Sequence, residues 1–302
     1  WNFNIWNFAP FELGPLTFLL MSKLRMDRAF NLSADRWRCF IGKVQHLMER
    51  NCNPYHNFYH VVDVMQTTFM FIDKMGGRAY LKDIDVISLI VGALVHDLDH
   101  PGLNNPYQIN KRTRLAILYN DMSVLENYHI ATAFEMFGNP EYDIFDSIDA
   151  QSRKSIRRVM INCVLATDMT VHFQLKGELD SVISTYFSGH LLKDKDRDVL
   201  LKALLHLADI GNPTKPWDVS KRWSDLVVQE FFAQGDREKE EGLPVSANMD
   251  RTTTVQDELS INFNDFIVAP YFMAVTSILP KLHTVCSLIL ENRDTWHEMF
   301  EQ

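Results

Sequence analysis

Residues 84–95 read IDVISLIVGALV, are apolar on nearly every side, and run directly into an ionisable cluster made of His96, Asp97, Asp99 and His100. A helix that is apolar around its circumference is buried on most sides, so it needs several packing neighbours. Buried ionisable groups are costly unless they are paired or bind a metal ion. The segment therefore predicts a central helix that brings polar groups into the interior of the protein.

Apolar residues recur at three- and four-residue intervals along nearly the whole chain, a spacing typical of helices. The sequence has no run of alternating β-branched residues and no Asn-Gly hairpin turn. Ser33 is a candidate N-cap for a helix that carries Trp37 to Met48, and a second apolar stripe follows from Val61 to Thr68. Further helices are expected near residues 105–118, 123–137, 152–170, 197–209, 217–234, 255–279 and 281–299.

These patterns predict a compact, single all-α domain over residues 1–302, with N-terminal helices over residues 1–50 and a functional core over residues 51–302. The chain shows no internal repeat and no interdomain linker. Residues 235–244 are strongly charged and are expected to form a solvated surface loop, with a mobile flap beside a pocket as the alternative.

The composition excludes some classes of function. The chain has 39 acidic and 30 basic residues and a net charge of −9, which argues against nonspecific binding to nucleic acids. The four cysteines show no paired spacing, so free thiols in a reducing compartment, and hence a cytoplasmic location, are expected. No apolar run reaches about 18 residues, so the sequence predicts no transmembrane helix. Because the chain begins at Trp1 and shows no signal peptide, we expect a domain of a longer protein whose regulatory or membrane-associating regions lie outside it.

Five groups of histidines and acids lie inside or at the ends of the apolar helical segments: His56 with His60, His96 to His100, Glu126 with His129, Asp168, and His206 with Asp209. Residues three or four apart share one face of a helix, so His56 and His60 are expected on one face. Any single group could be a hydrogen-bonded core residue or a helix cap. Burying all of them without ions would cost on the order of several kcal/mol for each unpaired charge. A shared metal cluster is the simpler explanation.

The types of ligand limit which metal ions would suit the site. Two imidazoles and two carboxylates without cysteine suit zinc or another divalent ion. The remaining carboxylates could hold a second, harder ion such as magnesium or manganese through water. Two divalent ions about 4 Å apart can share a hydroxide that attacks phosphorus in line. The residues alone therefore predict metal-dependent phosphoester hydrolysis, with the metal site at the base of a deep pocket.

Several motifs occur together, in the order and with the spacing of a known family. They are His56-Asn-Phe-Tyr-His60, His96-Asp-Leu-Asp-His-Pro-Gly102, Tyr119-Asn-Asp121, Leu125-Glu-Asn-Tyr-His129, Ala166-Thr-Asp-Met169, Leu207-Ala-Asp-Ile-Gly-Asn-Pro213, Gly235-Asp-Arg-Glu and Phe266-Ile-Val-Ala-Pro270. From about residue 50 to residue 300, the chain resembles the catalytic domain of class I cyclic nucleotide phosphodiesterases. The resemblance implies hydrolysis of cAMP, cGMP or both to the 5′-monophosphate, as part of signal transduction.

The resemblance also implies roles for individual residues. His60, His96, Asp97 and Asp209 would ligate a tightly held zinc ion, and Asp97 would bridge it to a magnesium or manganese ion. A hydroxide between the ions would attack the cyclic phosphorus, while His56 would protonate the departing 3′ oxygen.

Other residues would support this chemistry. Glu126 would orient and charge the His56 imidazole. Three side chains would fix waters and orient the ligands: His100, His129 and Asp168. The nucleotide would lie against four residues: Tyr55, Asn212, Ser260 and Phe263. Among these, Phe263 would clamp the purine, and Asn212 would lie near the base.

The chain departs from the family pattern at two positions. Tyr128 stands where the family usually has a histidine, although the next residue, His129, is kept. Ser260, three residues before Phe263, stands where the family has a glutamine that hydrogen-bonds the purine edge. Gln256, one helical turn earlier, is a candidate to reach in instead. The departure leaves the affinity for the base and the preference between cAMP and cGMP open.

Two other functions stay open at this stage. A different histidine–aspartate phosphohydrolase, acting on nucleoside triphosphates or alarmones, would share such ligands, but it needs a basic cluster for the polyphosphate, and none adjoins His96-Asp97. A catalytically weakened fold that senses nucleotides is the second, and Ser260 is the one feature in its favour. The expected partner is a cyclic nucleotide, and a homodimer is a further possibility.

Overall fold

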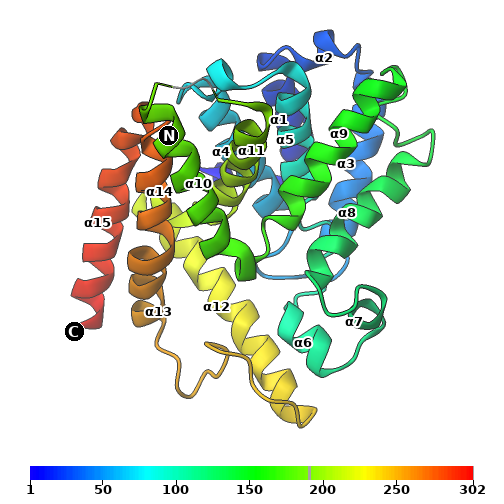
Figure 1. Ribbon diagram of the computed structural model, residues 1–302. Coiled ribbons are helices and arrows are strands. Elements are labelled where there is room, and N and C mark those ends of the chain that lie inside the picture. The colour runs from blue at the N-terminus through cyan, green and yellow to red at the C-terminus, as the bar shows by residue number, and fades with distance from the viewer. Residues whose placement is uncertain (190–191, 302) are drawn as a thin grey trace.

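Helix α5 (Asp83–Val95) lies among α4 (Phe58–Asp73), α9 (Ala150–Leu165) and α11 (Asp194–Asp209), which pack against it (Figure 1). Every residue from Asp85 to Val95 is buried. The apolar composition therefore leads to the central helix that the sequence predicted, and the chain leaves this helix at the ionisable cluster.

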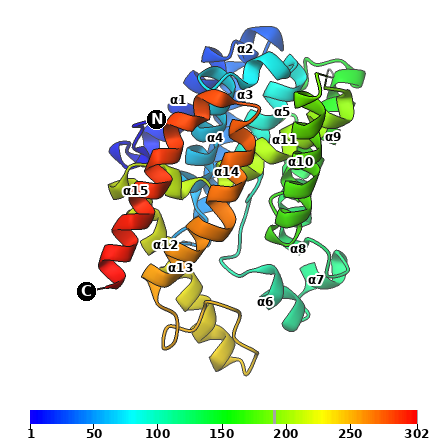
Figure 2. The ribbon, with the colours of Figure 1, turned by 60° about the vertical axis from the view of Figure 1, so that its left-hand side comes forward.

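The C-terminal helices form a layer along one side of the molecule, where α13 (Gln256–Asn262), α14 (Ala269–Thr276) and α15 (His283–Phe300) lie beside α12 (Trp217–Glu240) (Figure 2). On another side, α6 (Asn105–Asn110) and α7 (Arg114–Leu118) project beyond the end of α8 (Val124–Phe137).

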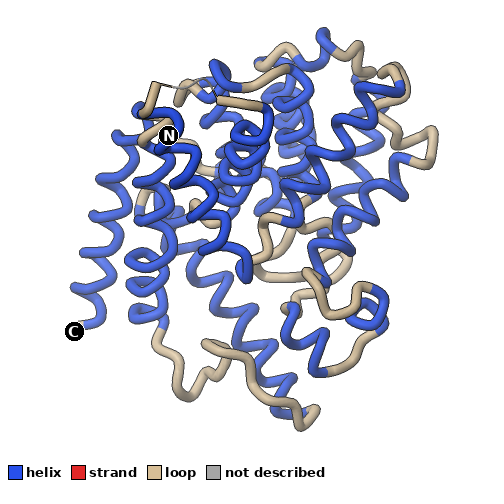
Figure 3. The backbone as a smooth tube through the Cα atoms, in the orientation of Figure 1, coloured by secondary structure: helices blue, strands red, loops and turns tan. Residues whose placement is uncertain are grey.

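The structure is a computed structural model that describes residues 1–189 and 192–301, and these residues form helices and loops without a strand (Figure 3). The expectation of an all-α fold is confirmed. The remaining helical elements are η1 (Ile5–Asn7), α1 (Pro10–Lys23), α2 (Met26–Ala29), α3 (Ala34–Glu49), η2 (Gly77–Tyr80), η3 (Met169–Val171), α10 (His172–Phe187), η4 (Asn212–Thr214), the π-helix η5 (Phe263–Val268) and η6 (Pro280–Leu282).

The N-terminal segment packs on the same core as the rest of the chain. Buried apolar residues form one continuous cluster that reaches from Ile5 to Ile289. The indole N–H of Trp1 donates to the carbonyl of Thr214 at 2.6 Å, and the ring centroids of Trp6 and Trp223 lie 4.6 Å apart. No helix in the described part of the chain combines the length and the apolar character that crossing a membrane requires.

The charged segment 235–244 is mostly helical, so the expectation of a surface loop is wrong. Helix α12 continues to Glu240. A Cβ atom on Gly235 would lie 1.8 Å from the carbonyl oxygen of Met249, so this glycine permits close packing and does not act as a hinge. Glu238 is buried, and its carboxylate accepts hydrogen bonds from the backbone N–H and the hydroxyl of Ser246. Tertiary contacts therefore stabilise a helix in a segment whose charge pattern had suggested a solvated loop.

Two of the expected helices are interrupted. Arg112 adopts a left-handed φ of 51°, which separates α6 from α7. In the expected helix 255–279, the π-helix η5 separates α13 from α14. Pro270 explains this break, because proline lacks the N–H of a regular ladder and its ring crowds the carbonyl four residues earlier. Helix α10, which carries Gly177 and several hydroxyl residues of low helix propensity, was not predicted.

Candidate active site

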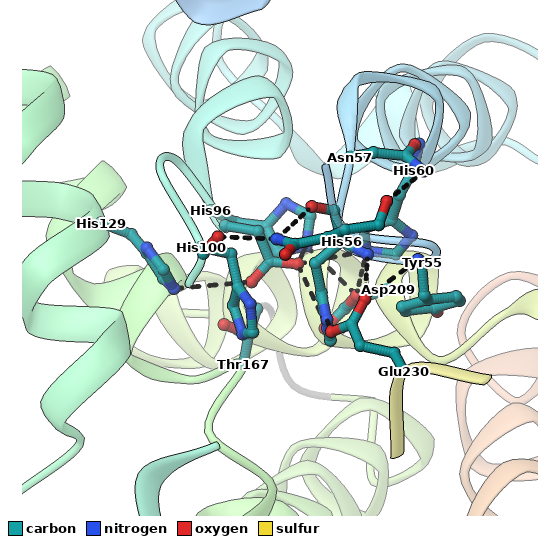
Figure 4. A network of polar contacts seen from close by, with 12 residues as sticks. Tyr55, His56, Asn57, His60, His96, His100, His129, Thr167, Asp209 and Glu230 are labelled. Atoms are coloured by element: carbon teal, nitrogen blue, oxygen red, sulfur yellow. Dashed lines mark hydrogen bonds and ion pairs between the residues drawn. The ribbon is translucent and has the colours of Figure 1, made fainter. Parts of the chain in front are cut away.

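Four side chains, carried by α4, α11 and the turn after α5, converge at one point (Figure 4). His60 lies in the first turn of α4, His96 and Asp97 follow the end of α5, and Asp209 is the last residue of α11. His60 Nε2 lies 3.3 Å from an Asp97 oxygen and 3.1 Å from an Asp209 oxygen. His96 Nε2 lies 3.2 Å from an oxygen of each carboxylate. The structure thus brings together the four residues expected to hold the first metal ion.

The chemistry of this group suits a divalent cation. His96 Nδ1 lies 2.9 Å from the carbonyl oxygen of Ala93, a contact that places the proton of the neutral ring on Nδ1. The Nε2 lone pair then faces the lone pairs of Asp97 and Asp209, an arrangement that only a positive charge between them makes favourable. Burial lowers the pKa of His96, but the Asp97 and Asp209 carboxylates outweigh it and hold that pKa well above its usual value. A bound cation would supply this charge while the imidazole stays neutral.

His56 lies in the loop before α4 and not on the helix, so the expectation that His56 and His60 share a helical face is wrong. Asn57 caps α4 by accepting hydrogen bonds from the N–H groups of Tyr59 and His60. The helix therefore begins at Phe58, and His56 approaches the site from the loop, with its Nε2 3.9 Å from an Asp97 oxygen.

The carboxylate that contacts His56 belongs to Glu230 of α12, not to Glu126. Glu230 Oε1 lies 2.5 Å from His56 Nδ1, and Oε2 accepts the backbone N–H groups of Tyr55 and His56, each at 3.0 Å. Burial lowers the pKa of His56, but the carboxylates of Glu230 and Asp97 outweigh it and raise that pKa to about 9. The signal for Glu230 is a single acid in the apolar helical run around Val228 and Phe231.

Glu126 lies in the first turn of α8 and lines the same cavity as Asp97 and Asp209. Its carboxylate accepts hydrogen bonds from the side-chain amide of Asn105, at 3.0 and 3.3 Å. Burial and the nearby Asp168 carboxylate raise the pKa of Glu126 to about 7. The expectation that Glu126 orients His56 is thus corrected by the contact between His56 and Glu230.

The three expected supporting residues lie around this cavity. His100 stacks on His56 with ring centroids 3.8 Å apart, and its Nδ1 accepts the N–H of Gly102 at 3.0 Å. His129 Nδ1 lies 2.7 Å from the carbonyl oxygen of Leu98, and its Nε2 lies 3.8 Å from an Asp97 oxygen.

Asp168 is engaged by its own neighbours, since it accepts the Ser123 hydroxyl at 2.7 Å and the Thr170 N–H at 2.8 Å. His206, one of the histidines that the sequence pattern selected, lies outside the metal-ligand group in the described residues and contacts His172 at 2.8 Å.

Asp99 of the ionisable cluster contacts Tyr128, the residue that stands where the family pattern has a histidine. Asp99 adopts a left-handed φ of 63°, and its buried carboxylate pairs with the Arg50 guanidinium and accepts the Tyr128 hydroxyl. The side-chain amides of Asn51 and Asn53 donate to the backbone carbonyl of His100, the residue after Asp99. These contacts fix the turn that follows Asp97, and Tyr128 takes part in them through its hydroxyl group.

A second cavity of about 360 Å³ adjoins the first and shares His56 and Asp209 with it. The four residues expected to contact the nucleotide all line this second cavity: Tyr55, Asn212, Ser260 and Phe263. Asn212 donates to the Tyr55 hydroxyl at 2.6 Å. Gln256 does not line the cavity, because its amide donates to Ser224 at 3.0 Å and to Asp225 at 2.7 Å.

Comparisons with known proteins place this site in a family. The family model for 3′5′-cyclic nucleotide phosphodiesterases matches residues 55–289. The chain is 32% identical over 302 residues to the 3′,5′-cyclic-nucleotide phosphodiesterase regA of Dictyostelium discoideum, a match covering all of this chain and 38% of the relative. It is 36% identical over 289 residues to the dual specificity calcium/calmodulin-dependent 3′,5′-cyclic nucleotide phosphodiesterase 1B of Bos taurus, covering 93% of this chain and 53% of the relative. The chain thus spans about half or less of the length of these two relatives.

Solved structures show the same similarity over whole chains. The phosphodiesterase domain of the RhoPDE fusion protein from the choanoflagellate Salpingoeca rosetta superposes with a TM-score of 0.93 at 30% identity, covering 100% of this chain and 95% of that one. LmjPDEB1 in complex with IBMX superposes with a TM-score of 0.91 at 30% identity, covering 99% and 92%. The chain belongs to the 3′5′-cyclic nucleotide phosphodiesterase family.

Proposed function

We propose that this chain hydrolyses the 3′,5′-cyclic phosphodiester of cAMP, cGMP or both to the 5′-nucleoside monophosphate. One observation carries the proposal: His56, held by Glu230, lies beside four convergent metal-ligand side chains, with its Nε2 3.9 Å from Asp97. The relatives support it, because those of Dictyostelium and Bos taurus are both named as 3′,5′-cyclic nucleotide phosphodiesterases.

Two divalent ions fit the residues present. His60, His96, Asp97 and Asp209 would hold a tightly bound zinc ion, and Asp97 would share a magnesium or manganese ion with it. His129 Nε2 is buried without a hydrogen-bond partner among the described residues and faces Asp97, which leaves it available to a water molecule on that side. When bound, the ions supply positive charge that stabilises the phosphoryl oxygens and activates water.

His56 acts as the general acid. Hydrolysis breaks the bond between phosphorus and the 3′ oxygen, and this oxygen needs a proton to leave as a hydroxyl group. His56 delivers that proton from Nε2, because its Nδ1 proton is engaged by Glu230. The raised pKa of about 9 keeps the imidazole protonated at neutral pH. Tyr55, Asn212 and Phe263 line the adjoining cavity and hold the nucleoside.

A direct assay tests the proposal. The protein is incubated with cAMP and with cGMP, and the 5′-monophosphates are separated by chromatography, with and without a chelator. We expect product from at least one nucleotide, loss of activity after exhaustive chelation, and recovery when zinc together with magnesium or manganese is returned. His96→Ala should abolish both hydrolysis and the rise in Tm that zinc causes, because it removes a ligand. His283→Ala removes an exposed histidine outside the site and should leave both intact.

The same assay separates this function from the alternatives. A panel of nucleoside triphosphates and alarmones, with phosphate or pyrophosphate release as the readout, should give no turnover. Faster turnover of any of these than of the cyclic nucleotides would favour the histidine–aspartate phosphohydrolase. Tight binding of cyclic nucleotide without turnover, in protein that carries metal, would favour the nucleotide sensor.

A further inference from the structure

Asn264 is a buried polar residue that lines the second cavity. The residue is 1% exposed, and its side-chain oxygen has no hydrogen-bond partner among residues 1–189 and 192–301. By contrast, the buried amide of Asn292 donates to two backbone carbonyls, each at 2.8 Å. Buried polar groups are nearly always hydrogen-bonded, so an unpaired amide oxygen in a residue that lines a cavity calls for a partner that the described residues do not provide.

The consecutive helices α13 and η5 carry three polar residues at four-residue intervals, which are Gln256, Ser260 and Asn264. Gln256 bonds to Ser224 and Asp225, so its amide is used outside the cavity. Ser260 lines the cavity, but its hydroxyl lies 3.1 Å from that of Ser224. Asn264 is next in this series and lies at the start of the π-helix, so it is the amide of the series that remains available.

The other walls of the cavity near Asn264 are largely apolar and aromatic, with Phe231, Phe263, Trp296 and Val227 among the lining residues. Binding pockets of this kind hold a flat ring by apolar contact and use a few polar groups to fix its orientation. A side-chain amide offers one acceptor oxygen and an NH₂ donor group, a pair that matches the donor and acceptor atoms on the edge of a purine.

We propose that the side-chain amide of Asn264 hydrogen-bonds the purine edge of the nucleotide and is a principal determinant of base affinity in this chain. The inference rests on the proposed function, because it assumes that the nucleoside occupies the second cavity. Ser260 stands where the family has a glutamine, and its side chain is too short to make the same hydrogen bond to the purine. We assign that hydrogen bond to Asn264 instead.

The experiment compares variants of the protein carrying its metal ions. Asn264→Leu replaces the amide by a side chain of similar size, and Asn264→Ala removes it without adding bulk. The matched control is Asn262→Leu, the same substitution at an exposed position two residues earlier, at the end of α13. The readouts are KM and kcat for cAMP and cGMP, calorimetric affinities for 5′-AMP, 5′-GMP and ribose 5-phosphate, and the Tm of the protein without nucleotide.

Both Asn264 variants should raise KM for the better nucleotide about tenfold, the usual effect of leaving one hydrogen-bonding edge unpaired, with kcat nearly unchanged. Affinity for the matching 5′-monophosphate should fall by a similar factor, while affinity for ribose 5-phosphate, which lacks a base, should not change. Because the amide is unpaired in the free protein, Tm should stay the same or rise. A purely structural role for Asn264 predicts the opposite, a lower Tm with equal losses for all ligands.

The inference is overturned if the Asn264 variants match Asn262→Leu in KM and in nucleotide affinity while the wild-type protein hydrolyses cyclic nucleotides. If the wild-type protein neither hydrolyses cyclic nucleotides nor binds 5′-monophosphates, the proposed function and this inference both fall. The two failures are therefore distinguishable.

Discussion

Glu230 holds His56 through both of its carboxylate oxygens: Oε1 contacts the imidazole Nδ1 at 2.5 Å, and Oε2 accepts the backbone N–H of the same residue at 3.0 Å. One side chain thus fixes the position, the orientation and the charge of the histidine. Burial raises the pKa of Glu230, but His56 outweighs it and lowers that pKa to about 2, so the two residues form an ion pair at neutral pH.

Glu230→Gln should move the alkaline limb of the kcat–pH profile to lower pH. As the proposed general acid, His56 would act only when protonated, so activity should be lost as the pH rises through its pKa, which is about 9 with Glu230 ionised. Removing the negative charge lowers this pKa. We expect kcat at pH 8 to fall at least about tenfold, since a positioned general acid contributes on the order of 10²–10⁴ in rate.

The control for this experiment is Glu126→Gln, because Glu126 contacts Asn105 and not His56. Its alkaline limb should coincide with that of the wild-type protein, whatever its effect on the maximum rate. A shift of the alkaline limb in Glu126→Gln and none in Glu230→Gln would restore the pairing that the sequence had suggested.

Sequence patterns could identify the site residues that lie within or directly after a regular helix. The apolar run of α5 leads directly to His96 and Asp97, so burial and ligand chemistry were visible in one stretch of chain. The contact between His56 and Glu230 was harder to predict, because the two residues are 174 positions apart and their contact depends on how α12 packs. The spacing between His56 and His60 also suggested one helix, but Asn57 caps α4 between them. Caps and long-range packing decided these details, and neither leaves a periodic signal.

Arg50→Ala should destabilise the fold strongly, although Arg50 is half exposed. Its partner, the Asp99 side chain, is only 2% exposed, so the substitution leaves a buried carboxylate without its cation. Such losses typically cost about 3–5 kcal/mol. Tyr128→Phe removes only the hydroxyl that Asp99 accepts and should cost about 1–3 kcal/mol. Urea denaturation measures both.

The comparison for Arg50 is Arg38→Ala, whose ion pair with Asp35 is exposed on both sides. It should change the free energy of unfolding by no more than about 0.5 kcal/mol. Equal effects of Arg38→Ala and Arg50→Ala would show that burial of Asp99 does not decide the cost.

Gly235→Ala and Gly177→Ala should change stability in opposite directions. Both glycines lie inside helices, but a Cβ on Gly235 meets the Met249 backbone at 1.8 Å, whereas a Cβ on Gly177 meets no atom of the described residues within 4 Å. The first substitution forces α12 and the 249 segment apart and should cost about 1–3 kcal/mol. The second replaces glycine by a better helix former and should add about 0.5–1 kcal/mol. A stable Gly235→Ala variant with unchanged Tm would contradict this account of the α12 extension.

Ser260→Gln should lower KM with little change in kcat. Ser260 lines the cavity of about 360 Å³, and a longer side chain that ends in an amide can reach further into it than a hydroxyl. A contact to the base acts equally on the bound substrate and on the transition state, so it changes binding more than the rate of the bound complex. Steady-state kinetics with cAMP and cGMP measure this, and Ser181→Gln, at an exposed serine of α10, is the matched control. If KM stays unchanged for both nucleotides in Ser260→Gln, position 260 does not face the base and the register of α13 relative to the family is incorrect.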